Sequence, residues 1–220
     1  MKTSIVPELV RKDVSLLRTP ALLWWLGGLV SVALMALGPF LLGMILFVTC
    51  LAGAGFHVAV QSVVEERREG TLTFLMSLPV TPGQYAAAKI LANLAVMAPL
   101  WLTLSGASLI VFAPGGMAHG AFPFVVIVLV GIFLAFAIVL ATSLLSGNIG
   151  AAIAAIVGGN IATQLFLWWL VDLPSVRAVL QGDVVVWNAT LVRALTGQVL
   201  AIVALLGATW LIRSRQRDCL

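Results

Sequence analysis

The stretch from Ala21 to Val64, ALLWWLGGLVSVALMALGPFLLGMILFVTCLAGAGFHVAVQSVV, decides the fold because it stays apolar for more than forty residues. A helix crosses the hydrocarbon core of a bilayer in about 20 residues, so this stretch holds two membrane-spanning helices. Gly38-Pro39 is the predicted turn between them. Trp24 and Trp25 are expected at one membrane interface of the first helix, where indole rings are enriched.

The composition of the whole chain also indicates a membrane protein. Of its 220 residues, 62% are hydrophobic and only 9% are charged, whereas about a quarter of a soluble domain is charged. In lipid the backbone must satisfy its own hydrogen bonds, which leaves helices or a closed barrel. The apolar runs are continuous and do not alternate, and this excludes a barrel. We therefore predict an all-α membrane protein with a single transmembrane domain over residues 1–220.

Four further spans are expected, which gives six transmembrane helices. They cover about 84–112, 124–145, 149–171 and 195–212, each an apolar run bounded by turn residues or charges. The segment 172–194 is too polar to span, and we expect it outside the cytoplasm, where it could dip into the membrane as short re-entrant pieces. Residues 6–18 are expected to form a short amphipathic helix of their own that lies in the membrane interface. Its predicted apolar face carries Val6, Leu9, Val10, Val14 and Leu17.

The basic residues predict the orientation of the bundle. Six spans place both termini on one side of the membrane, and cytoplasmic loops are enriched in Lys and Arg. With that side in the cytoplasm, only Arg177 and Arg193 lie outside, and Lys89 lies just inside the cytoplasmic end of the third span. The cytoplasmic set is then Lys2, Arg11, Lys12, Arg18, Arg67, Arg68, Arg213, Arg215 and Arg217. This orientation accounts for the net charge of +4 without any nucleic-acid binding.

Residues 65–83 connect the second and third spans and hold a compact group of charges. The run Glu65 to Glu69 is predicted to continue the second helix beyond the membrane surface, and Gly70 permits a bend. Thr71 to Leu78 has the length of about two helical turns, and Pro79 and Pro82 end it. The pattern predicts a short, mainly apolar helix beneath the bilayer, suited to contact with a partner. A solvated loop whose charges only set the topology is the alternative.

The run EERREGTLTFLMSLPVTPGQYAAAKILANL resembles a region of ABC-2-type transporter permeases. In that family a Glu-rich Gly-Thr-Leu segment leads to Leu-Pro-Val and later to a Lys at the start of the next helix. The matching residues are Glu66, Glu69, Gly70, Thr71, Leu72, Leu78, Pro79, Val80 and Lys89. The resemblance implies the permease subunit of an ATP-driven exporter in a bacterial inner (plasma) membrane. A second permease copy, or a related permease, would enclose the transport pathway with it.

The resemblance also implies that a separate ABC ATPase subunit binds ATP and Mg²⁺, so this chain needs no cofactor and no metal of its own. The sequence has no G-x-x-x-x-G-K-[ST] loop to hold ATP phosphates. The segment between spans two and three would be the coupling helix that docks on the ATPase. Its docking residues would be Glu65, Glu66, Arg67, Arg68, Glu69, Gly70, Thr71, Leu72, Phe74, Leu75, Met76, Leu78 and Pro79. Family members often carry an acidic residue where this chain has Thr73.

Polar residues within the spans are few, and two pairs are candidates for lining a transport pathway. His57 and Gln61 lie one helical turn apart in the second span, and Asn160 and Gln164 do so in the fifth. Hydrogen bonding between helices is the alternative role for such residues. The fifth span also repeats small residues every four positions, which lets helices approach closely.

Three other functions are consistent with parts of the sequence. A haem-exporter-B-like subunit of cytochrome c maturation has a similar length and a related charged run. An ion-coupled carrier would use an ionisable residue such as His57, and an assembly scaffold would need no ATPase. A fourth class, the intramembrane proteases with paired glutamates, requires an arginine four residues after the second glutamate. That position, four residues after Glu66, is Gly70, which argues against this class.

Overall fold

The structure, a computed structural model, describes residues 5–66, 80–112 and 119–216. The described residues are almost all helical and contain no strand, as predicted. Its long helices are α1 (Val6–Leu37), α2 (Phe40–Val60), α5 (Pro82–Phe112), α6 (Phe122–Ser146), α7 (Ile149–Asp172) and α9 (Ala189–Arg215). Shorter elements are η1 (Gln61–Glu65), a π-helical turn that continues α2, the 3₁₀ turn η2 (His119–Ala121) and α8 (Pro174–Leu180).

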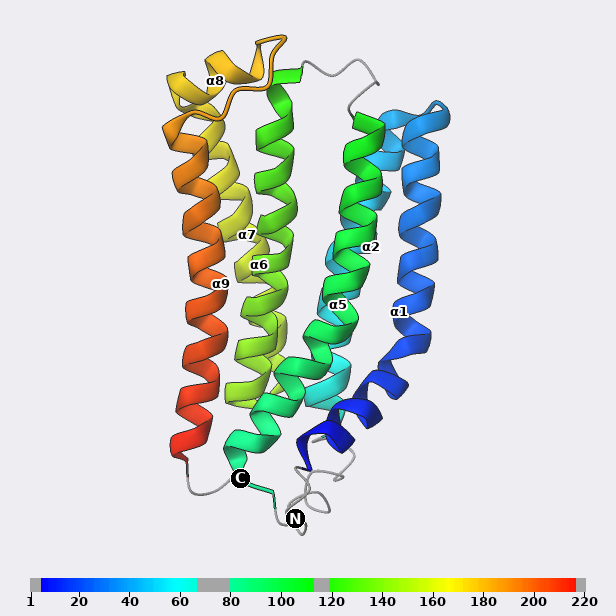
Figure 1. Cartoon of the computed structure of the whole chain (residues 1–220), viewed down its shortest axis with the longest axis vertical. Coiled ribbons are helices and arrows are strands. Elements are labelled where there is room, and N and C mark those ends of the chain that lie inside the picture. The colour runs from blue at the N-terminus through cyan, green and yellow to red at the C-terminus, as the bar shows by residue number, and fades with distance from the viewer. Residues whose placement is uncertain (1–4, 67–79, 113–118, 217–220) are drawn as a thin grey trace.

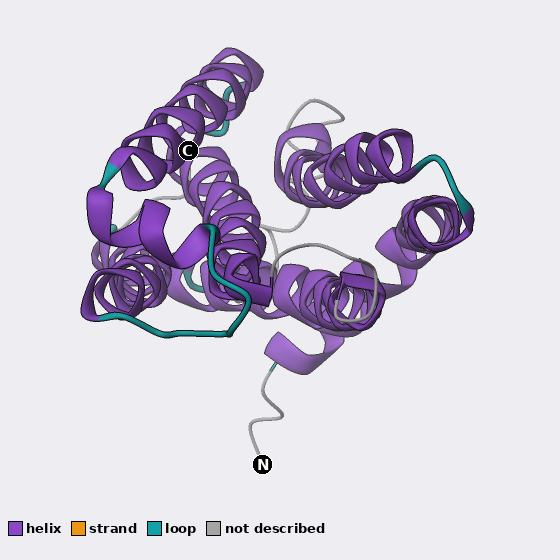
Figure 2. Cartoon of the chain, turned by 90° about the horizontal axis from the view of Figure 1, so that it is seen from above, coloured by secondary structure: helices purple, strands orange, loops and turns teal. Residues whose placement is uncertain are grey.

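Six helical segments are long and apolar enough to cross a membrane, which confirms the number of predicted spans. α1 begins and α9 ends at the same end of the bundle, here called the terminal end (Figure 1). α8 lies at the opposite end, here called the α8 end (Figure 1). Within the polar segment 172–194, α8 is too short to cross a membrane, and residues 189–194 belong to α9, which begins earlier than the predicted start near residue 195. Figure 2 looks along the long helices from the α8 end.

The six helices form two groups that share one core. α1 packs against α2 and α5, and α6 packs against α7 and α9. Contacts of α2 with α6 and of α5 with α9 join the two groups. Each of three helices buries a large side chain in the shared core: Leu51 from α2, Met97 from α5 and Phe136 from α6. α6 is the most deeply buried of the six spans, whereas α7 and α9 expose most of their side chains. Exposed apolar side chains are expected where lipid is the solvent.

The turns between helices follow the predicted positions. Gly38 ends α1 and Pro39 immediately precedes α2. Gly147 ends α6 with a φ of 61°, a left-handed conformation that glycine adopts without strain. Asn148 then caps α7, because its Oδ1 accepts a hydrogen bond from the Gly150 backbone nitrogen at 2.8 Å.

The prediction of a separate interfacial helix over residues 6–18 is wrong in one respect. These residues are the first turns of α1, which continues without a break through Pro20. Figure 1 shows that the beginning of α1 leans away from the direction of the rest. Proline removes one backbone hydrogen bond and bends a helix without necessarily ending it. One helix therefore carries charged residues from the terminal end directly into the bundle.

α5 begins at Pro82, two residues before the predicted start near Gln84. Thr81 and Gln84 form a capping box there. The Thr81 backbone nitrogen donates to Gln84 Oε1 at 3.0 Å, and the Gln84 backbone nitrogen donates to Thr81 Oγ1 at 3.2 Å. This reciprocal pair satisfies two backbone donors that the helix itself leaves open, and so fixes where α5 begins.

Candidate functional site

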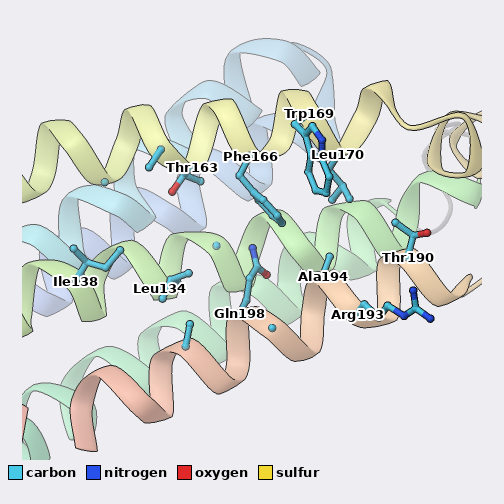
Figure 3. Close-up of a pocket in the computed structure, with 15 residues that line it drawn as sticks. Leu134, Ile138, Thr163, Phe166, Trp169, Leu170, Thr190, Arg193, Ala194 and Gln198 are labelled. Atoms are coloured by element: carbon cyan, nitrogen blue, oxygen red, sulfur yellow. The ribbon is translucent and has the colours of Figure 1, made fainter. Parts of the chain in front are cut away.

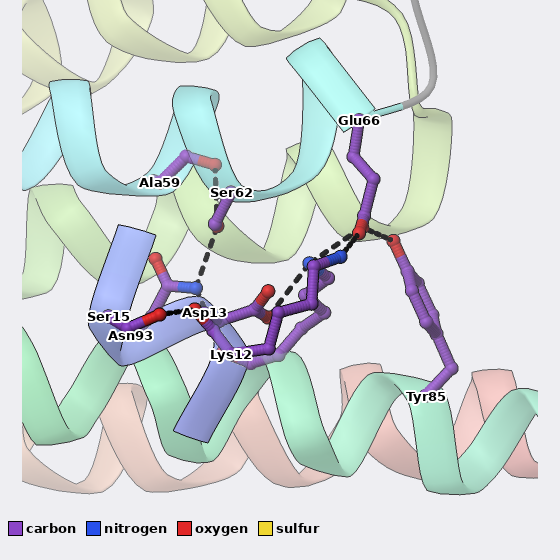
Figure 4. A network of polar contacts seen from close by, with 9 residues as sticks. Lys12, Asp13, Ser15, Ala59, Ser62, Glu66, Tyr85 and Asn93 are labelled. Atoms are coloured by element: carbon purple, nitrogen blue, oxygen red, sulfur yellow. Dashed lines mark hydrogen bonds and ion pairs between the residues drawn. The ribbon is translucent and has the colours of Figure 1, made fainter. Parts of the chain in front are cut away.

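Four charged side chains meet at the terminal end, where α1, α5 and the end of η1 come together. We call Lys12, Asp13, Glu66 and Lys89 the ion cluster. Lys89 Nζ lies 2.8 Å from Asp13 Oδ2 and 2.6 Å from Glu66 Oε2. Lys12 Nζ donates to Glu66 Oε1 at 2.7 Å, and the Tyr85 hydroxyl donates to Glu66 Oε2 at 3.1 Å (Figure 4).

The inner part of the ion cluster is removed from solvent. The side chains of Asp13 and Lys89 are each 4% exposed and that of Glu66 is 8% exposed, whereas Lys12 is 47% exposed. Two cations and two anions balance, so no net charge is buried. Burial raises the pKa of the Glu66 carboxyl, but the attraction of Lys89 and the hydrogen bonds from Lys12 and Lys89 outweigh it. The pKa of Glu66 is therefore below its ordinary value, which favours the charged form of this carboxylate.

Helical spacing brings the α5 side of the site together. Tyr85, Lys89 and Asn93 recur every four residues and so lie on one face of α5. Lys89 Nζ lies 5.5 Å from the centre of the Tyr85 ring, within the range of a cation–π contact. Asn93 Nδ2 donates to Ser62 Oγ at 2.8 Å, which ties α5 to η1 one turn deeper than the ion cluster (Figure 4).

Glu66 reaches the ion cluster directly after a π-helical turn. η1 spans Gln61–Glu65, and its side chains Ser62, Val63 and Val64 are buried against the bundle. A π-helical turn holds more residues than an α-helical one, so it rotates the residues that follow it. Glu65 is left exposed while the Glu66 carboxylate turns toward α1 and α5.

The predicted docking segment is described only at its first residues. Glu65 and Glu66 are the docking candidates that the structure describes; Arg67 to Pro79, with Leu72, Phe74, Leu75 and Met76, lie outside the described residues. The Glu66 carboxylate is bound inside the bundle by Lys12, Tyr85 and Lys89, and a role of Glu66 in docking stays a prediction. Glu66 thus fixes the start of the segment to the bundle.

The two pairs of pathway candidates lie on different helices. On α2, His57 is exposed beside the Trp24 ring, with ring centres 6.4 Å apart, and Gln61 is half-buried. On α7, Asn160 and Gln164 are exposed, and Asn160 Nδ2 donates to Ile156 O of its own helix at 2.8 Å. Among the described residues no hydrogen bond joins one pair to the other. A role in lining a pathway stays a prediction for all four.

Arg213 has a structural role that its sequence position did not reveal. Its guanidinium is buried at the terminal end, where Nε donates to Leu144 O at 2.9 Å and Nη2 also contacts Leu144 O and Leu145 O. These carbonyls end α6 and have no partner within the helix. A cation at a helix C-terminus also interacts favourably with the helix dipole. Arg213 therefore fastens the end of α9 to the end of α6.

Sequence reasoning missed Asp13 and Tyr85, although one signal pointed to them. Lys89 is the only Lys or Arg between Arg68 and Arg177, and a lone cation within a span needs an anionic partner. Asp13 is the eighth residue of α1, just as Lys89 is the eighth residue of α5, so the two lie at a comparable distance from the starts of their helices.

Comparison with known protein families places this arrangement in a wider group. A family model described as ABC-2 family transporter protein matches residues 8–213, which include all six long helices almost completely and every residue of the ion cluster. Comparisons with curated proteins and with solved structures found no significant match. The match extends over far more than half of the 220 residues and agrees with the six spans. The chain therefore belongs to the ABC-2 transporter family.

Proposed function

We propose that this chain is the permease subunit of an ATP-driven exporter, and that a separate ABC ATPase subunit docks on the segment between α2 and α5. Membership of the ABC-2 family makes the chain a multi-pass membrane transporter subunit. The observation that carries the finer proposal is the ion cluster, because it holds both ends of that segment. Glu66 precedes the segment, and Tyr85 and Lys89 follow it.

The ion cluster is suited to passing on a mechanical force. A partner that pushes on residues 67–79 moves Glu66 and the start of α5 together. Lys12 and Asp13 connect these two points to α1, so three helices would move as one body. Removing one member of a buried ion pair costs about 3–5 kcal/mol, so the connection resists being pulled apart. A solvated loop with surface charges would not transmit force in this way.

The distribution of basic residues supports a cytoplasmic location for the terminal end, which is the side of the membrane where ATP is available. The described residues Arg11, Lys12, Arg213 and Arg215 lie toward the terminal end, whereas Arg177 and Arg193 belong to α8 and the start of α9. The positive-inside rule therefore supports a cytoplasmic position for the ion cluster, in what we propose is a bacterial inner membrane. ATP and Mg²⁺ are bound by the ATPase in this proposal, and this chain holds neither.

A second permease, either another copy or a related chain, completes the transporter. Six helices form a small bundle, and α7 and α9 leave most of their side chains exposed. Small residues on α7 near the terminal end, such as the exposed Gly150 and Ala154, allow close approach of another helix. The pathway for the substrate would lie between the two permeases, and lipid would cover the remaining outer surface.

The proposal is tested by purifying the tagged protein from its native membrane in mild detergent. We expect an ABC ATPase in equal amount, and we expect Leu75→Glu to release it, because a carboxylate replaces an apolar docking residue. Leu37→Glu is the matched control, since Leu37 is 85% exposed at the α8 end and should leave the complex intact. A wild-type preparation that is folded but contains no ATPase would contradict the proposal.

A further inference from the structure

A groove in the α8 half of the bundle has the features of a binding site that the ion cluster does not explain. It has a volume of about 620 Å³ and lies between α6, α7 and α9. Small-molecule sites in proteins have volumes of about 300–1,000 Å³ and are mainly apolar with a few placed polar groups. Leu134, Ile138 and Phe166 provide apolar walls (Figure 3). Trp169, Gly197 and Ala201 are exposed, so the groove opens at the side of the bundle.

One buried polar side chain points into the groove. Gln198 is only 6% exposed, and Figure 3 shows its amide directed from α9 toward α6 and α7. Gly131 on α6 makes room for it, because a Cβ there would lie 3.3 Å from Gln198 Nε2. Gln198 Oε1 has no hydrogen-bond partner among the described residues. A buried amide oxygen without a donor favours a ligand that brings a hydroxyl or an N–H group.

One cation stands at the α8 end of the same groove. Arg193 lines it and makes no ion pair or hydrogen bond with any residue in the described parts of the chain. The nearby Arg177 differs, because its Nη2 lies 2.6 Å from Asp172 Oδ1. Arg193 and Gln198 are five residues apart on α9, which corresponds to about 7.5 Å along the helix. Arg193 therefore lies at one end of the groove and Gln198 deeper in it, and beyond Gln198 the walls are mainly apolar, with Thr163 as a polar exception (Figure 3).

We propose that this groove binds an amphiphile with one apolar chain and an anionic head. Arg193 pairs with the phosphate or carboxylate of the head, since a guanidinium binds such groups with two parallel hydrogen bonds. Gln198 Oε1 accepts a hydrogen bond from a hydroxyl or amide N–H about 7.5 Å deeper along α9. The chain then lies against Leu134 and Ile138 and extends toward the middle of the bundle. The site acts independently of the ATPase docking proposed above.

Two glycines allow a sharp test, because a Cβ added at either one meets no atom within 4 Å. Gly159 lines the groove, and an added Cβ there meets nothing within 4 Å; the adjacent Gly158 is equally open but does not line it. Gly159→Leu should therefore fill the groove, and Gly158→Leu is its control on the same helix. Arg193→Gln removes the cation, and Arg177→Gln is the matched control at the same end of the bundle.

The probe is lysophosphatidylglycerol with a photoreactive group near the end of its chain, added to the purified full-length protein. We expect saturable labelling of peptides that contain Leu134 or Ile138. Gly159→Leu should abolish this labelling, and Arg193→Gln should weaken it about tenfold or more. Gly158→Leu and Arg177→Gln should leave it unchanged. A monoacylglycerol probe with the same chain should bind about as weakly as lysophosphatidylglycerol binds to the Arg193→Gln variant.

Native mass spectrometry of the purified protein, recorded before any probe is added, identifies the source of the amphiphile. A bound phospholipid in the native mass spectrum identifies a resident membrane lipid, and its absence together with saturable labelling identifies an amphiphile that arrives from solution. Either result supports the site. Labelling that does not saturate, or that Gly159→Leu leaves intact, shows only surface lipid and overturns the proposal. So does a Gly159→Leu variant that loses its dimer while labelling is unchanged, because the groove would then be an interface between copies.

Discussion

Replacing Lys89 with methionine tests the ion cluster directly. Methionine keeps the length of the side chain but removes the cation that lies 2.8 Å from Asp13 and 2.6 Å from Glu66. Two buried carboxylates are then left near one another, and Lys12 remains to balance only one of them. Breaking a buried pair in this way costs about 3–5 kcal/mol of folding free energy. For chains of about 150–250 residues, 1 kcal/mol shifts Tm by about 2–4 °C, so Tm should fall by about 6–20 °C.

The assay is thermal unfolding of the detergent-purified protein, followed by intrinsic fluorescence. Lys12→Met is the matched control, because Lys12 is 47% exposed and Glu66 keeps its contact with Lys89, so this variant should lose less stability than Lys89→Met. The double variant Asp13→Asn/Lys89→Met should recover at least half of the lost stability, since it restores charge balance. The reasoning is refuted if Lys89→Met and Lys12→Met lower Tm equally. It is also refuted if the fall in Tm of the double variant equals the sum of the falls caused by Asp13→Asn and Lys89→Met alone.

Three further predictions concern other parts of the terminal end. Arg213→Ala should lower the free energy of unfolding by about 1.5–3 kcal/mol, because charge-assisted hydrogen bonds to the end of α6 are lost. Arg215 is exposed, so Arg215→Ala should have almost no effect in the same unfolding assay. The pKa of Glu66 is lowered from an ordinary value of 4.5, so its stabilising contribution is complete above pH 4.5 and is lost as the pH falls through the lower folded pKa. The Tm difference between wild type and Glu66→Gln should thus be constant near neutral pH and shrink below pH 4.5; a difference that grows in acid would contradict this. Finally, a cysteine introduced at Ser214 in a cysteine-free background should react with an impermeant reagent only from the cytoplasmic side, and labelling from outside would overturn the orientation.

Much of the fold could be predicted because hydropathy acts over whole segments. The apolar run from Ala21 to Val64 predicts two spans whatever they pack against, and Gly38-Pro39 and Gly147 mark turns through their backbone preferences. The continuity of α1 could not be read in this way. Pro20 allows either an end or a bend, and the packing of α1 on α2 and α5 decides for the bend. The capping box of Thr81 and Gln84 was readable from the sequence alone.

The site was less predictable because its partners come from distant parts of the chain. The sequence shows that Lys89 needs an anion, but the choice of Asp13 depends on how α1 is rotated against α5. Glu66 and Glu65 look alike in sequence, and only the π-helical turn before them separates a buried carboxylate from an exposed one. The groove beside Gln198 arises from the packing of three helices and leaves no local pattern.

The most direct test of the account follows α1 while the ATPase binds nucleotide. Spin labels at the exposed positions Arg11 on α1, Leu91 on α5 and Arg215 on α9 report two distances, from α1 to α9 and from α5 to α9. In the purified complex we expect a non-hydrolysable ATP analogue to change both distances together. In Asp13→Asn/Lys89→Met, which lacks the buried bridge and whose folding the unfolding assay above checks, the distance from α1 to α9 should no longer follow the distance from α5 to α9. If α1 still moves with α5 as it does in the wild type, the ion cluster does not transmit the movement.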